Sequence, residues 1–238
     1  FGDVAAVVLA AARRPAYLTL PKVRGLDCIE RAAHTADALG APEVPLHALV
    51  ETHGALAQVQ ALAAHPRIEC LSFGLMDFVS AHRGAIPQWA MSADGQFDHP
   101  LVVRAKLEIA AACHAHGKVP SHGVVTEFQD SAALAEAARK AAELLGYTRM
   151  WSIHPAQVRT IVAAFSPTAD EVAQAVAILR AAEAADWAPI RHTSGGAETL
   201  HDRASYRYFW QVLQRAERLP AGLPPEVRRD WFATGERA

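Results

Sequence analysis

Two carboxylates, Glu51 and Asp77, stand 26 residues apart in this chain. The residues from Val44 to Val50 are mostly apolar, which is typical of a strand buried on both faces, so Glu51 should lie where that strand ends. Ile68 to Phe73 has the pattern of the next strand, and Gly74-Leu75-Met76 leads to Asp77 at the corresponding exit. Because neighbouring parallel strands lie about 4.8 Å apart, both carboxylates should project from one edge of a sheet.

Two carboxylates in such a position repel each other unless a proton or a metal ion lies between them. Magnesium takes hard oxygen ligands, commonly one or two carboxylates, and completes its shell with water and substrate oxygens. We therefore predict an open, catalytic site for Mg²⁺ or Mn²⁺ on Glu51 and Asp77. The spacing alone leaves open that the two carboxylates instead cap the helices that follow them.

Four short motifs follow one another between Ala16 and Phe165. They are Leu20-Pro21-Lys22-Val23, Val50-Glu51-Thr52, Phe73-Gly74-(two residues)-Asp77-Phe78, and Trp151-Ser152-Ile153-His154-Pro155-(one residue)-Gln157-Val158. Their order and spacing resemble those of the citrate lyase beta-subunit-like family, part of the HpcH/HpaI aldolase group. Each motif alone is a weak signal, whereas four in register are a strong one.

The resemblance implies a (β/α)8 TIM barrel that uses Mg²⁺ to make or break a carbon–carbon bond next to a carbonyl, often on a coenzyme A thioester. It makes Glu51 and Asp77 the metal ligands and catalytic carboxylates. It also implies that the backbone around Gly74, His154 and Pro155 lines the substrate pocket. Asp202 would be a catalytic residue that reaches a neighbouring subunit's site in a homo-oligomer, a trimer or hexamer by family resemblance.

The pattern along the chain is that of an α/β protein, with strands expected at Ala16–Leu20, Val44–Val50, Ile68–Phe73, Lys118–Pro120 with its continuation, and Arg149–Ile153. A complete eight-stranded barrel takes about 250 residues. We therefore expect three strands to precede Phe1, in a polypeptide that begins roughly 60–100 residues earlier. Residues 1–165 would form the catalytic part of the barrel, and residues 166–238 a C-terminal helical extension or lid.

Helices are expected at Val4–Arg13, Asp27–Leu39, Thr52–Ala64 and Leu101–Ala115, and in an alanine-rich run that begins near Phe128-Gln129-Asp130. Asp130 has the position of an N-cap, and Thr168 with Glu171 has the spacing of a capping box. Arg104 and Lys106 are expected to be solvated.

The sequence departs from the family pattern at two places. His82-Arg83 stands where relatives usually have a second aspartate, and Ser121-His122 stands where they often have an isoleucine and an aspartate. These differences keep open the alternative that the protein is a barrel paralogue that binds a ligand or partner but has lost catalysis.

The C-terminal part has a different composition. Pro189 to Glu198 is expected to be a loop, and Thr199 to Leu219 a helix. Within that helix Tyr206, Phe209, Trp210 and Leu213 recur at helical spacing, so we expect this apolar face to pack on the barrel or, as an oligomer contact, on another subunit.

The composition excludes several classes of protein. The chain has 238 residues, 51% of them hydrophobic, which is enough for a sizeable core and too apolar for a disordered protein. A net charge of −2 gives no electrostatic footprint for nucleic acid or an anionic membrane. Cys28, Cys70 and Cys113 are far apart and are expected to be reduced thiols in a cytoplasmic protein.

The leading hypothesis is a magnesium-dependent lyase that cleaves or condenses an acyl-CoA thioester with a small oxo acid. The alternative enzyme is a pyruvate-type class II aldolase that acts on a free hydroxy-oxo acid. A Schiff-base aldolase through Lys22 is less favoured, because that mechanism needs a lysine with a depressed pKa. A serine hydrolase is disfavoured because the sequence has no G-x-S-x-G elbow.

Overall fold

The computed structural model describes residues 2–11, 15–126, 130–194, 196–219 and 222–232. The chain divides into two compact units, Phe1–Phe165 and Ser166–Ala238. Phe128-Gln129, at the expected start of the alanine-rich helix, and Arg13, at the expected end of the first helix, lie outside the described residues.

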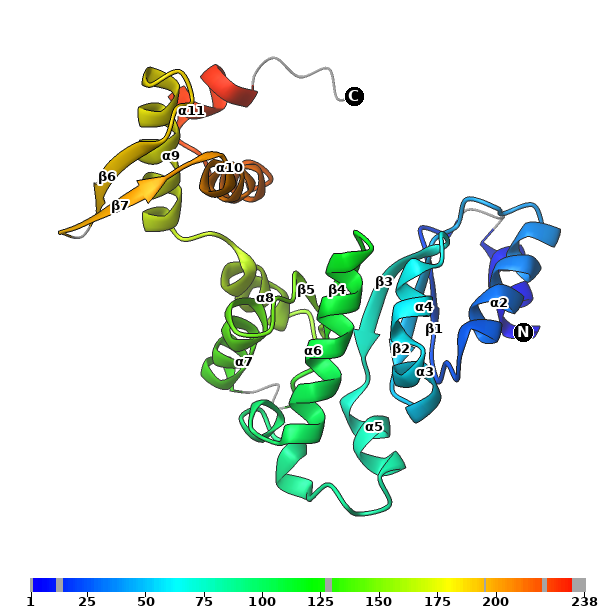
Figure 1. Cartoon of the computed structure of the whole chain (residues 1–238). Helices are drawn as coiled ribbons and strands as arrows, with labels where there is room; N and C mark the ends of the chain where they lie inside the picture. Colours follow the sequence, from blue (N-terminus) through cyan, green and yellow to red (C-terminus); the bar gives the residue numbers. More distant parts are fainter. Residues whose placement is uncertain (1, 12–14, 127–129, 195, 220–221, 233–238) are drawn as a thin grey trace. The chain divides into compact units, whose positions relative to one another are not determined.

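The first unit is built on a parallel sheet of five strands whose spatial order is their order in the sequence (Figure 1). The strands are β1 (Leu18–Leu20), β2 (Leu46–Val50), β3 (Ile68–Phe73), β4 (Val119–His122) and β5 (Arg149–Met150). Each predicted strand is therefore confirmed, although most are shorter than expected. Sequential parallel strands joined by right-handed crossovers place their helices on one face of the sheet, which is the arrangement of a (β/α) barrel wall. A closed eight-stranded barrel remains a prediction.

The helices of this unit are α1 (Gly2–Ala10), α2 (Leu26–Ala38), α3 (His53–Ala57), α4 (Val59–Ala64), α5 (Leu75–Ala81), α6 (Pro100–Ala115), α7 (Ser131–Glu143) and α8 (Gln157–Phe165), with 3-10 turns η1 (Gln88–Met91) and η2 (Gly95–Phe97). The run expected as one helix from Thr52 to Ala64 is two, because it breaks at Gln58. The Gln58 side chain accepts a hydrogen bond from the Leu26 N–H at 3.0 Å, and its φ of −112° departs from helical values. Asp130 is the N-cap of α7, as predicted.

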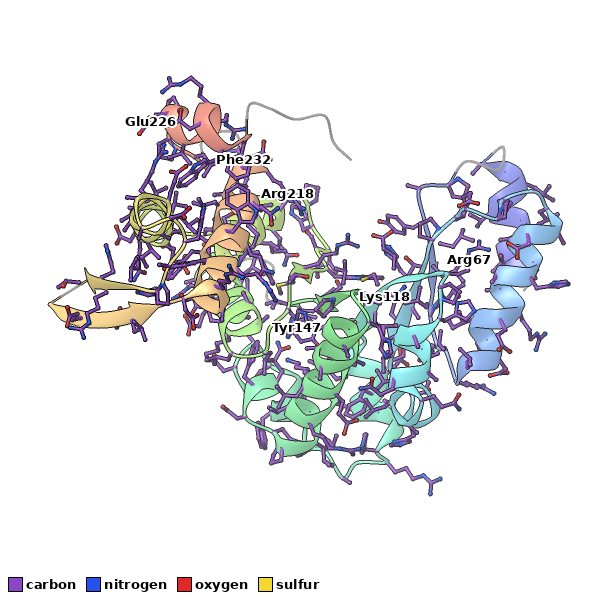
Figure 2. All side chains as sticks on the ribbon, turned by 45° about the horizontal axis from the view of Figure 1, so that its top comes forward. Arg67, Lys118, Tyr147, Arg218, Glu226 and Phe232 are labelled. Atoms are coloured by element: carbon purple, nitrogen blue, oxygen red, sulfur yellow. The ribbon has the colours of Figure 1, made fainter. Side chains whose placement is uncertain are left out.

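The core of the first unit lies between the sheet and helices α2, α4 and α6, which contact β2, β3 and β4 (Figure 1). Arg67, labelled in Figure 2, fixes the start of β3 against the preceding βα repeat. Its guanidinium donates to the carbonyl oxygens of Val44 at 2.8 Å and Ala41 at 3.3 Å, and it pairs with Asp37 of α2. These bonds hold neighbouring βα repeats together at the end of the sheet opposite to Glu51.

The second unit contains α9 (Ala169–Ala184), β6 (Ile190–Ser194), β7 (Ala197–His201), α10 (Arg203–Glu217), α11 (Pro225–Val227) and the π-helical turn η3 (Arg228–Phe232). The predicted capping box of Thr168 and Glu171 is present at the start of α9. The expected loop at Pro189–Glu198 is wrong, because most of it belongs to an antiparallel hairpin of β6 and β7. Gly196, with φ of 83°, provides the left-handed backbone angle that this tight turn needs.

The apolar face of α10 is covered within its own unit. Tyr206, Phe209 and Leu213 are buried in a core shared with α9, and Trp210 stacks on Phe232 with ring centroids 5.0 Å apart. The prediction that this face forms an oligomer contact is therefore wrong, because α9 and η3 already occupy it. A homo-oligomer stays a prediction that rests on the family resemblance.

One stretch of the described residues, Gln157–Ala184, is long and apolar enough to cross a membrane by length and composition alone. This stretch is weak evidence for a membrane span, because it consists of two helices, α8 and α9, separated by Ser166-Pro167-Thr168. Moreover, Ile178 and Leu179 of α9 belong to the core of the second unit.

Candidate active site

Glu51 lies directly after β2, at the strand exit where the sequence places it, and only 4% of it is exposed. Its Oε1 accepts the backbone N–H of Lys22 at 2.6 Å. Lys22 adopts a φ of 52°, a left-handed conformation that costs a non-glycine residue about 1–2 kcal/mol. The loop after β1 is thus held in an unfavourable conformation in which its N–H fixes the Glu51 carboxylate.

Gly74, at the exit of β3, forms the second support of Glu51. A Cβ atom at this position would lie 2.2 Å from Glu51 Oε2 and 2.7 Å from Glu51 Cβ. The carboxylate therefore rests directly on the Gly74 backbone, and any side chain at this position would displace it. The Gly74 N–H donates to the Val50 carbonyl oxygen at 3.2 Å, which keeps the two strand exits side by side.

Asp77 lies in the first turn of α5 instead of at the strand exit, which corrects the prediction. The reason is that α5 begins at Leu75, immediately after Gly74, without an intervening loop. The Asp77 side chain is half-exposed, and its Oδ1 lies 3.4 Å from the Lys22 ammonium. Lys22 thus contacts both carboxylates, one through its backbone and the other through its side chain.

The alternative that the two carboxylates cap helices does not describe this structure. Thr52 is the N-cap of α3, and its hydroxyl accepts the Ala55 N–H at 3.1 Å. Gly74 occupies the N-cap position of α5. Neither carboxylate is therefore the N-cap of the following helix, although Asp77 gains from the positive end of α5.

Burial raises the pKa of the Glu51 carboxyl above its ordinary value. The Lys22 N–H opposes this effect, the negative charge of Asp77 adds to it, and the Lys22 ammonium lowers the pKa. An ionised Glu51 is consequently short of positive charge in this structure. A cation placed between Glu51 and Asp77 would favour the ionised form of both.

Both carboxylates open onto one cavity of about 190 Å³. Its other lining residues are mostly apolar: Leu49, Ser72, Phe73, Gly74, Leu75, Met76, Met91, Gly123, Val124, Thr126 and Trp151. Ligand pockets usually measure about 300–1,000 Å³. This cavity therefore suits a small molecule with few polar groups at one end.

Two other predicted site residues, His154 and Pro155, do not line this cavity, and a third, Asp202, belongs to the second unit. His154 and Pro155 are exposed in the segment between β5 and α8, and His154 Nδ1 accepts the Ala156 N–H at 3.1 Å. Among the residues described here, neither lines the cavity around Glu51. Asp202, in the second unit, is the N-cap of α10 and accepts the Ala204 N–H at 2.9 Å. Its catalytic role toward a neighbouring subunit stays a prediction.

The contact between Ser72 and Trp151 is a feature of this cavity that the sequence did not indicate. Trp151 Nε1 donates a hydrogen bond to Ser72 Oγ at 3.0 Å, and both residues line the cavity. The available sequence signal was a hydroxyl side chain within the otherwise apolar end of β3. In the structure Ser72 is only 1% exposed.

Ser121-His122, the departure from the family pattern on β4, is buried. The His122 ring stacks on Phe97, with centroids 5.4 Å apart, and Tyr147 meets it edge-on at 5.2 Å. Burial and the nearby Lys106 charge lower the pKa of His122 well below its ordinary value. His122 therefore packs as a neutral core residue.

At the other departure from the family pattern, His82-Arg83, the His82 ring donates from Nδ1 to the Phe78 carbonyl oxygen at 2.7 Å.

Lys106 is fully buried, so the prediction that it is solvated is wrong. The η2 turn covers this part of α6, and Lys106 Nζ donates to Gln96 Oε1 at 2.8 Å above the Phe97 ring. Tyr147, labelled in Figure 2, donates its hydroxyl to the Lys106 carbonyl oxygen at 3.0 Å. Burial lowers the pKa of Lys106 well below its ordinary value. Arg104, in contrast, is exposed and pairs with Glu108.

Comparisons with known proteins relate most of the chain to one group of enzymes. No protein-family model matches the chain. It is 30% identical to an L-malyl-CoA/beta-methylmalyl-CoA lyase of Cereibacter sphaeroides, over 93% of this chain and 73% of that protein. A crystal structure of a citrate lyase from Burkholderia xenovorans LB400 is 55% identical, with a TM-score of 0.84 over 94% of this chain and 71% of the other.

A further solved structure is the citrate lyase beta subunit of M. tuberculosis complexed with oxaloacetate and magnesium. It is 26% identical, with a TM-score of 0.54 over 68% of this chain and 67% of the other. The chain belongs to the citrate lyase beta-subunit family of carbon–carbon lyases.

Proposed function

We propose that this protein is a magnesium-dependent lyase that cleaves or condenses an acyl-CoA thioester with a small oxo acid. The observation that carries the proposal is that Glu51 and Asp77 open onto one small, mostly apolar cavity. The Cereibacter relative is a malyl-CoA lyase by name, and the M. tuberculosis relative was solved with oxaloacetate and magnesium. Both names agree with this chemistry.

The residues present fit a magnesium ion. Gly74 leaves room for the Glu51 carboxylate at a position where a Cβ would displace it, and Lys22 holds the same carboxylate by its N–H. No group of three or more His, Cys, Asp or Glu side chains gathers as a metal site within the described part of the chain. Two carboxylates with an open cavity match the preference of Mg²⁺ for one or two protein carboxylates plus substrate oxygens. Glu51 and Asp77 would hold the ion.

A bound Mg²⁺ would supply positive charge beside the oxo acid's carbonyl oxygen, where negative charge develops as the carbon–carbon bond forms in the condensation direction. Glu51 presents a fixed carboxylate, because Lys22 and Gly74 restrain it on two sides. Lys22 Nζ, 3.4 Å from Asp77, adds a second positive charge at the same end of the cavity. The apolar walls exclude water and so strengthen these charge interactions.

Lys22 does not favour a Schiff-base mechanism in this structure. Its side chain is 70% exposed and ion-paired with Asp77, whereas a Schiff-base lysine is activated by desolvation or by another cationic group. This contact is consistent with a role of Lys22 in charge balance.

The substitution Asp77→Ala tests the proposal. Calorimetry should show that Mg²⁺ binds the parent more tightly in the presence of glyoxylate, oxaloacetate or pyruvate, and that the variant loses this binding. Stability should change by less than about 1 kcal/mol, because the Lys22–Asp77 pair is a surface ion pair. Glu108→Ala is a matched control, because it removes a partly exposed helical carboxylate that pairs with Arg104 outside the cavity.

Equal metal binding by the parent and Asp77→Ala would refute the site. Product analysis by mass spectrometry separates the alternatives. Formation of a hydroxyacyl-CoA from acetyl-CoA and an oxo acid supports the lyase. Cleavage of only a free hydroxy-oxo acid would support the class II aldolase, and metal-dependent binding without turnover would support a ligand-binding barrel.

A further inference from the structure

Trp151 crosses the sheet at the base of the candidate active site. It follows β5, and its indole N–H donates to Ser72 Oγ on β3 at 3.0 Å. Strand β4 lies between these two strands, since Ser72 pairs with Ser121 and Ser121 pairs with Arg149 (Figure 1). The hydrogen bond therefore spans β4 at the level of Ser121, whose side chain is small and fully buried.

Two cavities meet at Trp151. The first is the cavity of about 190 Å³ that contains Glu51 and Asp77. The second, of about 310 Å³, is lined by Tyr17, Thr19, His47, Cys70, Arg149, Met150, Trp151 and Ser152. Within the described residues, Trp151 is the residue that lines both cavities.

The strand register places the two cavities at successive levels of the same sheet face. Thr19, His47 and Cys70 pair across β1, β2 and β3, and they line the second cavity. Leu49 and Ser72 pair one step further along β2 and β3, toward the strand exits, and they line the first cavity. Side chains two residues apart on a strand point to the same face, so the second cavity lies directly below the first.

We propose that the Trp151 indole is the floor of the substrate cavity and sets the maximum length of the oxo acid. Ser72 is a positioning residue, because its hydroxyl fixes the indole across β4. This inference rests on the proposed function and adds a selection by chain length to it. The rigid indole has few rotamers, and its single N–H donor has an acceptor in Ser72, so the floor is well fixed.

Trp151→Ala should join the two cavities and admit longer 2-oxo acids. In condensation with acetyl-CoA, the ratio of kcat/KM for 2-oxobutyrate to that for glyoxylate should rise about 10-fold or more, the scale at which pockets discriminate single methylene groups. Trp151→Phe, which keeps an aromatic ring, should shift the ratio less and provides a second variant if the alanine variant unfolds. Trp89→Ala is the control, because Trp89 is exposed and lies outside the lining of the cavity.

Ser72→Ala tests the positioning role. It should raise KM for glyoxylate with little change in kcat, and Ser72→Thr, which keeps a hydroxyl acceptor, should restore KM. Tryptophan fluorescence should report a changed environment of the indole in Ser72→Ala, and the Ser72→Thr spectrum should return toward that of the parent.

The outcomes separate this inference from the proposed function. An active parent whose length preference is unchanged by Trp151→Ala and Trp151→Phe would overturn the floor assignment and leave the lyase intact. A parent without turnover would contradict the lyase, and the length preference would then be measured by calorimetric binding of the same oxo acids with Mg²⁺. An unchanged preference in that measurement, or no binding of any oxo acid, would also overturn the inference.

Discussion

Replacing Gly74 by alanine should displace the Glu51 carboxylate without altering any charge. The added Cβ would lie 2.2 Å from Glu51 Oε2, whereas Cβ contacts under 3.0 Å are essentially never seen, so the oxygen must move by at least about 0.8 Å. Glu51 Cβ, at 2.7 Å, blocks a simple rotation of the side chain. Overpacking of this kind costs about 1–3 kcal/mol, and the melting temperature should fall by about 2–12 °C.

The effect on function should be larger than the effect on stability. A misplacement of about 1 Å in an active site can cost about 100-fold in rate. We therefore expect Gly74→Ala to lower kcat/KM by about 100-fold and to weaken Mg²⁺ binding in the presence of an oxo acid. Thermal unfolding and calorimetry on the same samples measure both effects.

Two further variants show whether the displaced carboxylate is the cause. Gly2→Ala is a matched control, because a Cβ at Gly2 meets no atom within 4 Å. Glu51→Asp in the Gly74→Ala background withdraws the carboxylate and should recover part of the stability without restoring activity. Coupling between the two sites in this double-mutant cycle is the expected result. Parent-like stability and metal affinity of Gly74→Ala would show that Glu51 is not held against Gly74.

Three other predictions concern single ionisable groups. Burial raises the pKa of Glu51, so the ionised carboxylate lowers the stability of the folded protein at pH values above its ordinary pKa of 4.5. Glu51→Gln should therefore be more stable than the parent at pH 7 and lose Mg²⁺ binding. Urea titrations should show a smaller gain in stability at pH 5. Burial lowers the pKa of Lys106, so the parent loses stability as the pH falls below 10.5 toward the pKa of Lys106 in the folded protein. The stability of Lys106→Met should therefore exceed that of the parent by more at pH 7 than at pH 10. An equal difference in stability at both pH values would contradict a buried amine. Asp202→Ala should destabilise α10 by about 1 kcal/mol through loss of its N-cap, whereas Asp202→Ser keeps a cap and removes the carboxylate; full lyase activity of the serine variant would exclude a catalytic role.

The sequence alone determined the features that depend on neighbouring residues. The five strands, the Asp130 N-cap and the capping box of Thr168 and Glu171 follow from local patterns, and the structure contains each of them. The position of Glu51 at the end of β2 follows in the same way, because the apolar run that forms the strand ends at Val50 and Glu51 is the next residue. The order of the four motifs was sufficient to identify the family.

The tertiary structure decided which elements cover one another. Lys106 has the sequence context of a surface lysine, and only the packing of η2 over α6 shows that it is buried. The periodicity of α10 indicates an apolar face, but the face is covered by α9 of the same unit. The Trp151–Ser72 bond joins residues 79 positions apart. Helical and strand periods report that a face is apolar, whereas the partner of that face depends on contacts between residues distant in the sequence.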